Sequence, residues 1–254
     1  MSSIDRLRAL YAASSKHSNY QILSKKLAVA MGEDSIEVKS RYEKERLDYL
    51  TRYLDFNKKR ILDIGGNTGY FTFEMIELGA SCVHHYEGSK YHSEFVRLAS
   101  EYLNCDDRII TTNKYYCFDN TDGDKYQITL LLNVLHHLGD DYGNKNLSIE
   151  KAKILMLDQL NYMSDKTDEI VFQLGFCWKG NRNDGLFTNG TKKELIDFIT
   201  EGTRKKWDIL HIGIPVLCNR VIKYQDLNER SIVRDDSLGE FLNRPLFIMR
   251  SKLS

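Results

Sequence analysis

The chain has 254 residues, of which 42% are hydrophobic and 28% charged, a composition that can bury the core of one α/β domain with appended segments. Lysine and arginine number 36, as do aspartate and glutamate, so no overall basic field would hold nucleic acid by its phosphates. The five cysteines show no C-x-x-C spacing, which favours reduced thiols over a disulfide framework or a zinc site. We expect a cytoplasmic protein without membrane insertion, because the sequence has neither a hydrophobic signal region nor an apolar stretch long enough to cross a bilayer.

Residues 1–57 carry apolar side chains at helical spacing. The spacing predicts helices around Leu7 and Leu27, and a third helix over 38–56. We therefore predict two domains, an N-terminal helical cap over 1–57 and an α/β domain over 58–254.

Residues 60–70 join a short apolar run to a glycine-rich bend and a helix start. The run predicts a buried strand, and the helix that begins at Tyr70 is expected to end at Gly79. Gly65 and Gly69 would let the backbone approach a ligand, and the amides of the helix start would point at it. The pattern predicts a cofactor-binding turn, with an ordinary strand–helix turn as the alternative.

A second strand is predicted over 81–86, and it ends at Glu87. An acidic residue about twenty positions beyond a glycine turn can accept hydrogen bonds from both ribose hydroxyls of a nucleoside cofactor. A solvated glutamate at a strand end is the other interpretation. A dinucleotide is disfavoured, because Asn67 and Tyr70 stand where the pattern G-x-G-x-x-G has its second and third glycines.

The remaining segments continue the α/β alternation. Strands are predicted over 108–112, 127–133, 169–174 and 207–212, with a last strand over 245–250 that pairs antiparallel at the sheet edge. A helix over 149–163 is expected to bury Ile154, Leu155, Leu157, Leu160 and Met163, and a capping box at Thr191 and Glu194 opens another helix. The segment 216–243 could form a hairpin insertion or a flap.

Three stretches, in chain order, carry a resemblance to class I S-adenosylmethionine-dependent methyltransferases. The pattern D-x-G-x-x-x-G at 63–69 is similar to the first motif of that family, with Asn67 where the family commonly has a further glycine. Glu87 follows the second strand, and the stretch 133–138 (Asn-Val-Leu-His-His-Leu) resembles the segment after the fourth strand in many small-molecule methyltransferases.

The nearest similarity within that family is to methyltransferases that act on bacterial surface polysaccharides, such as those that cap an O-antigen. It rests on the paired histidines, the glycine and aromatic residues after the fifth strand, and the terminal stretch 244–248. Transfer-RNA wobble-uridine carboxymethyl-transfer enzymes share a similar core and a similar helical N-terminus.

The resemblance implies a Rossmann-like class I fold, with a mostly parallel seven-stranded sheet, helices on both faces and the helical cap. It also implies S-adenosylmethionine as the cofactor. The expected cofactor-binding residues are Asp63, Gly65, Gly66, Asn67, Gly69, Tyr70, Glu87, Gly88, Asn133, Tyr42 and Arg46. For Tyr42 and Arg46, which lie in the cap, a packing tyrosine and a surface charge are equally good interpretations.

Methyl transfer to a hydroxyl requires removal of a proton, and histidine is suited to this near neutral pH. We expect His137 as the general base, with His136 as second choice, although either could instead hold the loop by a backbone hydrogen bond. We expect no metal. His136, His137, Asp140 and Asp141 could bind one, but their spacing is not that of a known ligand set.

The loop 175–185 is polar with aromatic residues, which suits recognition of a phosphorylated or glycosyl acceptor. Trp178 could stack on a sugar, and Lys179 and Arg182 could bind phosphate. An ordinary surface loop is the alternative.

Three functions are therefore open. The first is an O-methyltransferase for a small polar acceptor, such as a sugar, a glycan end or a phosphorylated group in polysaccharide biosynthesis. The second is an RNA-modifying methyltransferase, and the third is a non-catalytic S-adenosylmethionine-binding protein. The neutral charge favours the first over the second.

Overall fold

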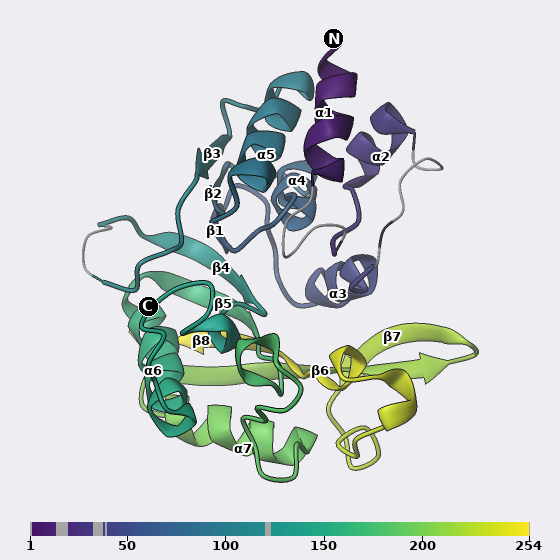
Figure 1. Ribbon diagram of the computed structural model, residues 1–254. Helices are drawn as coiled ribbons and strands as arrows, with labels where there is room; N and C mark the ends of the chain where they lie inside the picture. The colour runs from purple at the N-terminus through teal and green to yellow at the C-terminus, as the bar shows by residue number, and fades with distance from the viewer. Residues whose placement is uncertain (1, 14–19, 33–37, 39, 120–122, 254) are drawn as a thin grey trace. The chain divides into compact units, whose positions relative to one another are not determined.

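The structure is a computed structural model that describes residues 2–13, 20–32, 38, 40–119 and 123–253 (Figure 1). It divides into two compact units, Met1–Tyr116 and Cys117–Ser254, and each is described by itself. Within the described residues, no helix is both long enough and apolar enough to span a bilayer.

The first unit contains a three-stranded parallel sheet with its crossover helices. Its elements are α1 (Ser3–Ala12), α2 (Lys25–Met31), α3 (Glu43–Leu50), β1 (Arg60–Ile64), α4 (Tyr70–Glu77), β2 (Cys82–Tyr86), α5 (Lys90–Tyr102) and β3 (Ile109–Thr112). β1 pairs parallel with β2, and β2 pairs parallel with β3. The predicted strand–helix alternation of this part of the chain is confirmed.

The first unit follows from the burial pattern of its sequence. All of β1 after Arg60 is buried, as expected for a strand of a parallel sheet that is covered on both faces. α4 buries Phe71, Phe73 and Met75. α5 begins after Ser89, whose hydroxyl accepts a hydrogen bond from the amide of His92 and caps the helix.

The N-terminal helices pack within the same unit. α1 runs beside α5 (Figure 1), and the rings of Tyr11 and Phe95 lie 5.6 Å apart. The predicted third helix is shorter than expected, because α3 spans only Glu43–Leu50. Tyr42 precedes it with a φ of 57°, and the Glu43 carboxylate accepts from the amide of Arg41 at 3.0 Å, so a tight turn replaces the first part of the helix. The domain boundary after residue 57 stays a prediction.

The second unit contains a five-stranded mixed sheet. Its elements are β4 (Tyr126–Leu132), η2 (Leu135–His137), α6 (Ile149–Tyr162), η3 (Met163–Asp165), β5 (Thr167–Gln173), η4 (Trp178–Gly180), α7 (Lys192–Thr203), β6 (Trp207–Cys218), β7 (Val221–Asp226), η5 (Asp236–Leu238), η6 (Phe241–Asn243) and β8 (Leu246–Ser251). The strand order is β4-β5-β8-β6-β7, and only β4 and β5 pair in parallel.

The predicted sheet is wrong in strand number and in direction. The described residues form eight strands rather than seven, and β8 pairs antiparallel with β5 and β6, as β6 does with β7. β8 is antiparallel as predicted, but it lies between β5 and β6 and not at an edge.

The additional strand, β7, comes from the segment whose structure the sequence left open. Asn219 and Arg220 connect β6 to β7 with φ values of 50° and 65°, and two such residues form a tight hairpin turn. An asparagine followed by glycine would have predicted this turn, whereas arginine rarely adopts a positive φ.

The helix α6 begins after Ser148 as predicted, but its buried face differs from the expected one. Ala152, Met156 and Leu160 are buried, at intervals of four residues. Ile154 is 61% exposed and Leu155 is 38% exposed, so their predicted burial is wrong. The helix contacts the core through one narrow stripe, and Ile154 lies about 200° around the helix from Met156.

Candidate functional site

The glycine loop, residues 65–69, connects β1 to α4 in the first unit. Gly65, Asn67 and Gly69 all have positive φ, at 68°, 53° and 81°. Asparagine tolerates this left-handed conformation better than most residues, so Asn67 can replace a glycine without changing the path of the loop. The amides of Gly65 and Gly66 donate to the carbonyl of Tyr86, at 2.8 and 3.2 Å, which ties the loop to the end of β2.

Glu87 lies at the opening of this loop, as the sequence predicts. Its Oε2 accepts from the amide of Asn67 at 2.9 Å, and its Oε1 accepts from the amide of Ser89 at 2.7 Å. Two backbone amides thus hold the carboxylate beside the loop, just after the end of β2, and Nδ1 of His92 lies 4.0 Å from Oε1. This arrangement fits the ribose of a nucleoside cofactor.

A buried polar cluster lies beneath the loop. The hydroxyl of Thr72 is 2.7 Å from Oδ2 of Asp63 and 2.9 Å from Nδ1 of His85. Burial raises the pKa of Asp63 to about 6, against the hydrogen bond from Thr72, and burial lowers the pKa of His85 to about 3. A Cβ on Gly66 would lie 2.4 Å from the His85 ring, so only glycine fits at this position.

The other predicted residues of the first unit lie around the loop in different ways. Tyr70 is 3% exposed, and its backbone amide donates to Oε1 of Gln21 at 2.8 Å. A Cβ on Gly88 would lie 2.4 Å from the ring of Tyr115, so this glycine allows an aromatic side chain to approach the backbone.

The two residues predicted from the N-terminal helices lie at or in α3. Arg46 is 3% exposed and lies 3.9 Å from the Glu43 carboxylate. Tyr42 is half-buried at the start of α3. Cofactor contact by Tyr42 or Arg46 stays a prediction.

In the second unit, Asn133 follows β4 with a φ of 62°. Its Nδ2 donates to Oε1 of Gln173 at 2.9 Å, and its Oδ1 accepts from Nη1 of Arg244 at 2.8 Å. Arg244 also donates from Nε to Oε1 of Glu240 at 2.9 Å. Asn133 thus joins the ends of β4 and β5 to the segment before β8, and no pattern in the sequence indicates this network.

The histidine turn, residues 135–141, follows Asn133 directly. His136 is 3% exposed, and its Nδ1 accepts from the amide of Gly175 at 3.3 Å. A neutral ring that accepts at Nδ1 carries its proton on Nε2, so His136 holds a loop and is a poor general base. His137 is more accessible, with a side chain 18% exposed.

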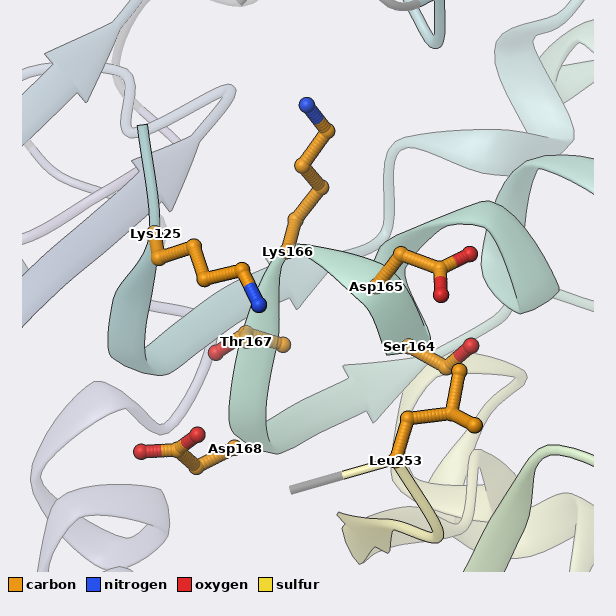
Figure 2. A pocket seen from close by; sticks show the side chains of 7 residues that line it. All are labelled: Lys125, Ser164, Asp165, Lys166, Thr167, Asp168 and Leu253. Carbon is orange, nitrogen blue, oxygen red and sulfur yellow. The ribbon is translucent and has the colours of Figure 1, made fainter. Parts of the chain in front are cut away.

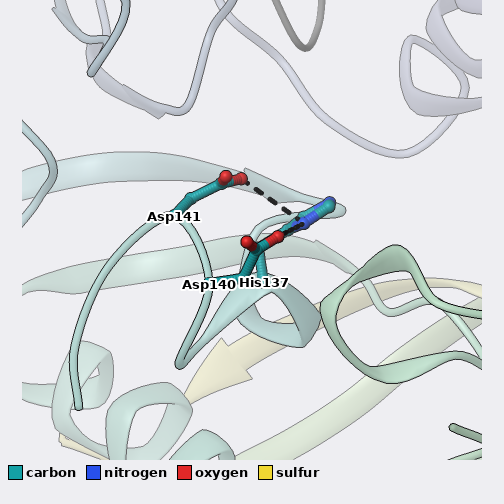
Figure 3. A group of neighbouring side chains, drawn as sticks. All are labelled: His137, Asp140 and Asp141. Atoms are coloured by element: carbon teal, nitrogen blue, oxygen red, sulfur yellow. Dashed lines mark ion pairs between the residues drawn. The ribbon is translucent and has the colours of Figure 1, made fainter. Parts of the chain in front are cut away.

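Figure 3 shows the carboxylates of Asp140 and Asp141 facing the ring of His137. The distances from Nδ1 to the nearest carboxylate oxygens are 3.9 Å for Asp140 and 3.4 Å for Asp141. One ligand atom from each of the three residues lies within 4.8 Å of the others, so the group could hold a metal ion. A carboxylate near Nδ1 also favours a proton on that nitrogen, which would leave Nε2 as the basic atom.

The three predicted acceptor-binding residues have different surroundings. Trp178 is 6% exposed, and its indole donates to the carbonyl of Leu138 at 2.7 Å, so it anchors the loop. The predicted stacking of Trp178 on a sugar is therefore corrected, since the indole is buried and Nζ of Lys179 covers its face at 4.1 Å. Lys179 also donates to the carbonyl of Lys145 at 3.2 Å, and Arg182 is exposed.

A small pocket of about 180 Å³ opens elsewhere in the second unit (Figure 2). It is lined by Lys125, Ser164, Asp165, Lys166, Thr167, Asp168 and Leu253. All of them except Leu253, which follows the antiparallel strand β8, precede β4 and β5 or begin β5, so the pocket lies at the amino ends of β4 and β5. Ligands of α/β sheets bind at the carboxyl ends, and we do not assign this pocket to the site.

Comparisons with known proteins identify the fold. No model of a protein family matches the sequence, and no curated protein matches it. Among solved structures, a co-crystal structure of WbdD with a kinase inhibitor has a TM-score of 0.63 at 14% identity, covering 96% of this chain and 47% of that chain. A structure described as the bifunctional kinase-methyltransferase WbdD gives 0.58 at 14% identity, covering 96% and 46%.

A second methyltransferase, which this chain covers almost completely, also matches the fold. Magnesium protoporphyrin IX methyltransferase from Synechocystis PCC 6803, solved with bound S-adenosylmethionine, has a TM-score of 0.50 at 12% identity, covering 98% of this chain and 91% of that chain. The chain therefore has the Rossmann-like fold of the class I methyltransferases, as its motifs predict. It spans about half the length of WbdD.

Proposed function

We propose that the chain is an S-adenosylmethionine-dependent methyltransferase that methylates an oxygen of a small polar acceptor. The acceptor we propose is a sugar, a glycan end or a phosphorylated group in surface-polysaccharide biosynthesis. The observation that carries the proposal is the pairing of Glu87 with the glycine loop, in which the carboxylate that follows β2 binds the loop amide of Asn67. An acidic residue at this place accepts hydrogen bonds from a ribose in nucleotide-binding α/β folds.

The first unit would bind the cofactor. Glu87 would accept hydrogen bonds from the ribose hydroxyls, and Gly65, Gly66 and Gly69 would let the loop backbone approach the ligand closely. When bound, the cofactor supplies an electrophilic methyl group on a sulfonium ion. Asp63 lies beneath the loop, so its contribution is to fix the loop through Thr72.

The second unit would supply the base. His137 would take the proton of the acceptor hydroxyl at Nε2, while Asp141 and Asp140 face Nδ1. His136 would act indirectly, because its bond to Gly175 holds the turn against the following loop. Lys179 and Arg182 remain the candidates for an anionic group on the acceptor.

Calorimetry with S-adenosylmethionine tests the binding step. The Glu87→Ala variant removes charge-assisted hydrogen bonds, each worth about 1.5–3 kcal/mol, so its dissociation constant should rise by at least about 100-fold. Glu229→Ala is the matched control, since Glu229 is an exposed residue of the second unit. Equal affinity in the wild type and Glu87→Ala would remove Glu87 from the site.

Product analysis with a labelled methyl donor tests the reaction. The panel should contain nucleotide sugars, glycan ends, phosphorylated sugars and transfer RNA. We expect label on an oxygen of a sugar or phosphorylated acceptor. Label on the RNA alone would favour an RNA methyltransferase, and binding without any labelled product would favour a non-catalytic S-adenosylmethionine-binding protein.

A further inference from the structure

Gln21 reaches the glycine loop from the segment between α1 and α2. The hydroxyl of Tyr11 donates to the carbonyl of Gln21 at 2.6 Å, which fixes the backbone at this position. The Gln21 side chain then extends to the start of α4. Its Oε1 accepts from the amide of Tyr70 at 2.8 Å and from the hydroxyl of Thr68 at 3.2 Å.

These two contacts determine which way the amide points. A backbone N–H can only donate, so the atom that faces Tyr70 must be the oxygen. The Nε2 group, with its two N–H donors, therefore points away from the amide of Tyr70. Within the described part of the chain, Nε2 has no hydrogen-bond acceptor, and Gln21 is half-buried.

The loop thus has hydrogen-bonding groups of opposite kind at its two ends. At Asn67 it carries the Glu87 carboxylate, which accepts hydrogen bonds. At Thr68 and Tyr70 it carries the Gln21 amide, which presents donors. A ligand that fits both ends carries hydroxyl groups at one end and a hydrogen-bond acceptor at the other.

Arg46 lies in the same unit, but its charge already has a partner. Its guanidinium carbon lies 5.0 Å from the ring of Phe71, and its side chain, 4% exposed, lies 3.9 Å from the buried carboxylate of Glu43. The donors of Gln21 are therefore the groups that point to a ligand acceptor at this end of the loop.

We propose that Gln21 is a cofactor-binding residue, whose Nε2 donates to the methionyl carboxylate of S-adenosylmethionine. This inference rests on the proposed function, because it takes that molecule as the ligand. The cofactor has ribose hydroxyls near one end and a single carboxylate at the other, which matches the two ends of the loop. Gln21 would thereby link cofactor binding to the segment between α1 and α2.

The test compares three ligands by calorimetry. S-adenosylmethionine and S-adenosylhomocysteine both carry the carboxylate, whereas 5′-methylthioadenosine has the adenine and ribose but no amino acid. The Gln21→Ala variant should bind the first two about 10- to 100-fold more weakly, through loss of hydrogen bonds to a charged group. Its affinity for 5′-methylthioadenosine should not change.

A second variant separates ligand contact from loop support. In Gln21→Glu, a carboxylate oxygen can still accept from Tyr70 and Thr68, but the donors are replaced by a negative charge. This variant should bind S-adenosylmethionine more weakly than Gln21→Ala does, while it binds 5′-methylthioadenosine like the wild type. Gln225→Ala is the matched control, since Gln225 is an exposed residue of β7.

Several outcomes would overturn the inference. An equal loss of affinity for all three ligands in Gln21→Ala, restored in Gln21→Glu, would give Gln21 a purely supporting role. Tighter binding of S-adenosylmethionine by Gln21→Ala would make Gln21 an obstruction. If the wild type bound neither S-adenosylmethionine nor 5′-methylthioadenosine, the proposed function itself would fail, and that result differs from one in which only Gln21 proves irrelevant.

Discussion

The glycine loop and the histidine turn differ in what fixes their functional groups. The loop is held mainly by residues close in sequence, since Asn67 binds Glu87, which lies 20 residues further on, and Gly65 and Gly66 bind Tyr86. Gln21 adds a contact to Thr68 from 47 residues away. The histidine turn depends on residues far along the chain. Gly175, which binds His136, is 39 residues away, and Trp178, which binds Leu138, is 40 residues away.

This difference separates two kinds of functional site. In the loop, backbone amides and one carboxylate make the contacts, so the chemistry is encoded in the backbone conformation. In the turn, the role of each side chain depends on its tertiary partners. His136 and His137 are adjacent in sequence, yet one is 3% exposed and accepts from a backbone amide, while the other faces two carboxylates.

Substitution of the two histidines should have the largest effects, and the effects should differ in kind between the two variants. His137→Ala should lower kcat by about 10²- to 10⁴-fold, the usual contribution of a general base, with cofactor affinity nearly unchanged. His136→Ala should mainly lower the free energy of unfolding, since it removes a buried loop contact. Steady-state kinetics, calorimetry and thermal unfolding measure the three quantities.

His211→Ala, at a partly exposed position of β6, serves as the control for both histidine variants. A His137→Ala enzyme that turns over at the wild-type rate would show that His137 is not the general base. Full activity in His137→Ala together with lost activity in a folded His136→Ala would exchange the two roles.

Gly66→Ala tests how closely the loop is packed. The added Cβ would lie 2.4 Å from the His85 ring and 2.7 Å from Oδ2 of Asp63, both in fixed buried positions. We expect the free energy of unfolding to fall by about 1–3 kcal/mol, as for other overpacked sites, and binding of S-adenosylmethionine to weaken. Gly123→Ala is the matched control, because no heavy atom lies within 4 Å of its Cβ position. Equal chemical denaturation curves for the two variants would show that the loop can move aside.

The same contrast explains what could be read from the sequence. The strands before and after the glycine loop, its glycines and Glu87 were all predicted, because each depends on its neighbours in the chain. The burial of Trp178 was not predicted, since the partner of its indole, the carbonyl of Leu138, is distant in sequence. An aromatic residue in a polar loop has the same local pattern whether it is an anchor or a contact surface.

Gln21 and Arg244 also make contacts that could not be predicted, because their partners are distant in sequence. Nothing near Gln21 in the sequence connects it to Tyr70, which is 49 residues away. Arg244 is 111 residues from Asn133. The hairpin of β6 and β7 was one of two alternatives left open for 216–243, for a different reason, since Arg220 adopts a positive φ that its residue type disfavours.

Asp63→Asn tests the buried cluster through the pH dependence of stability. The pKa of Asp63 is raised to about 6 by burial, so the folded state holds a proton that the unfolded state has already lost. The stability that this proton provides is present at low pH and is lost as the pH rises from about 4 to 6. An asparagine keeps the acceptor for Thr72 and does not ionise. Relative to the wild type, it should therefore stabilise the protein more at pH 7 than at pH 4, by about 2–3 kcal/mol.

The measurement is chemical denaturation of both proteins from pH 4 to pH 7. His85, whose pKa is lowered to about 3, contributes the opposite slope, because the unfolded state gains a proton there as the pH falls below about 6.5. His85 is present in both proteins, so its contribution largely cancels in the difference. Asp106→Asn, at an exposed position, should give a curve parallel to that of the wild type. A parallel curve for Asp63→Asn would mean that Asp63 is ionised throughout.

Removal of metal should have the smallest effect, and it distinguishes two uses of the histidine turn. If Nδ1 of His137 only faces Asp140 and Asp141, a chelator should leave turnover unchanged, because the carboxylates orient the ring without an ion. If an ion lies among these three residues, turnover should fall with the chelator and return with Zn²⁺ or Mn²⁺, ions that accept mixed imidazole and carboxylate ligands. Asp141→Asn would then lose the response to metal as well. That result would make His137 a metal ligand and would require a different group to take the acceptor proton. The experiment therefore decides whether His137 is a general base or a ligand.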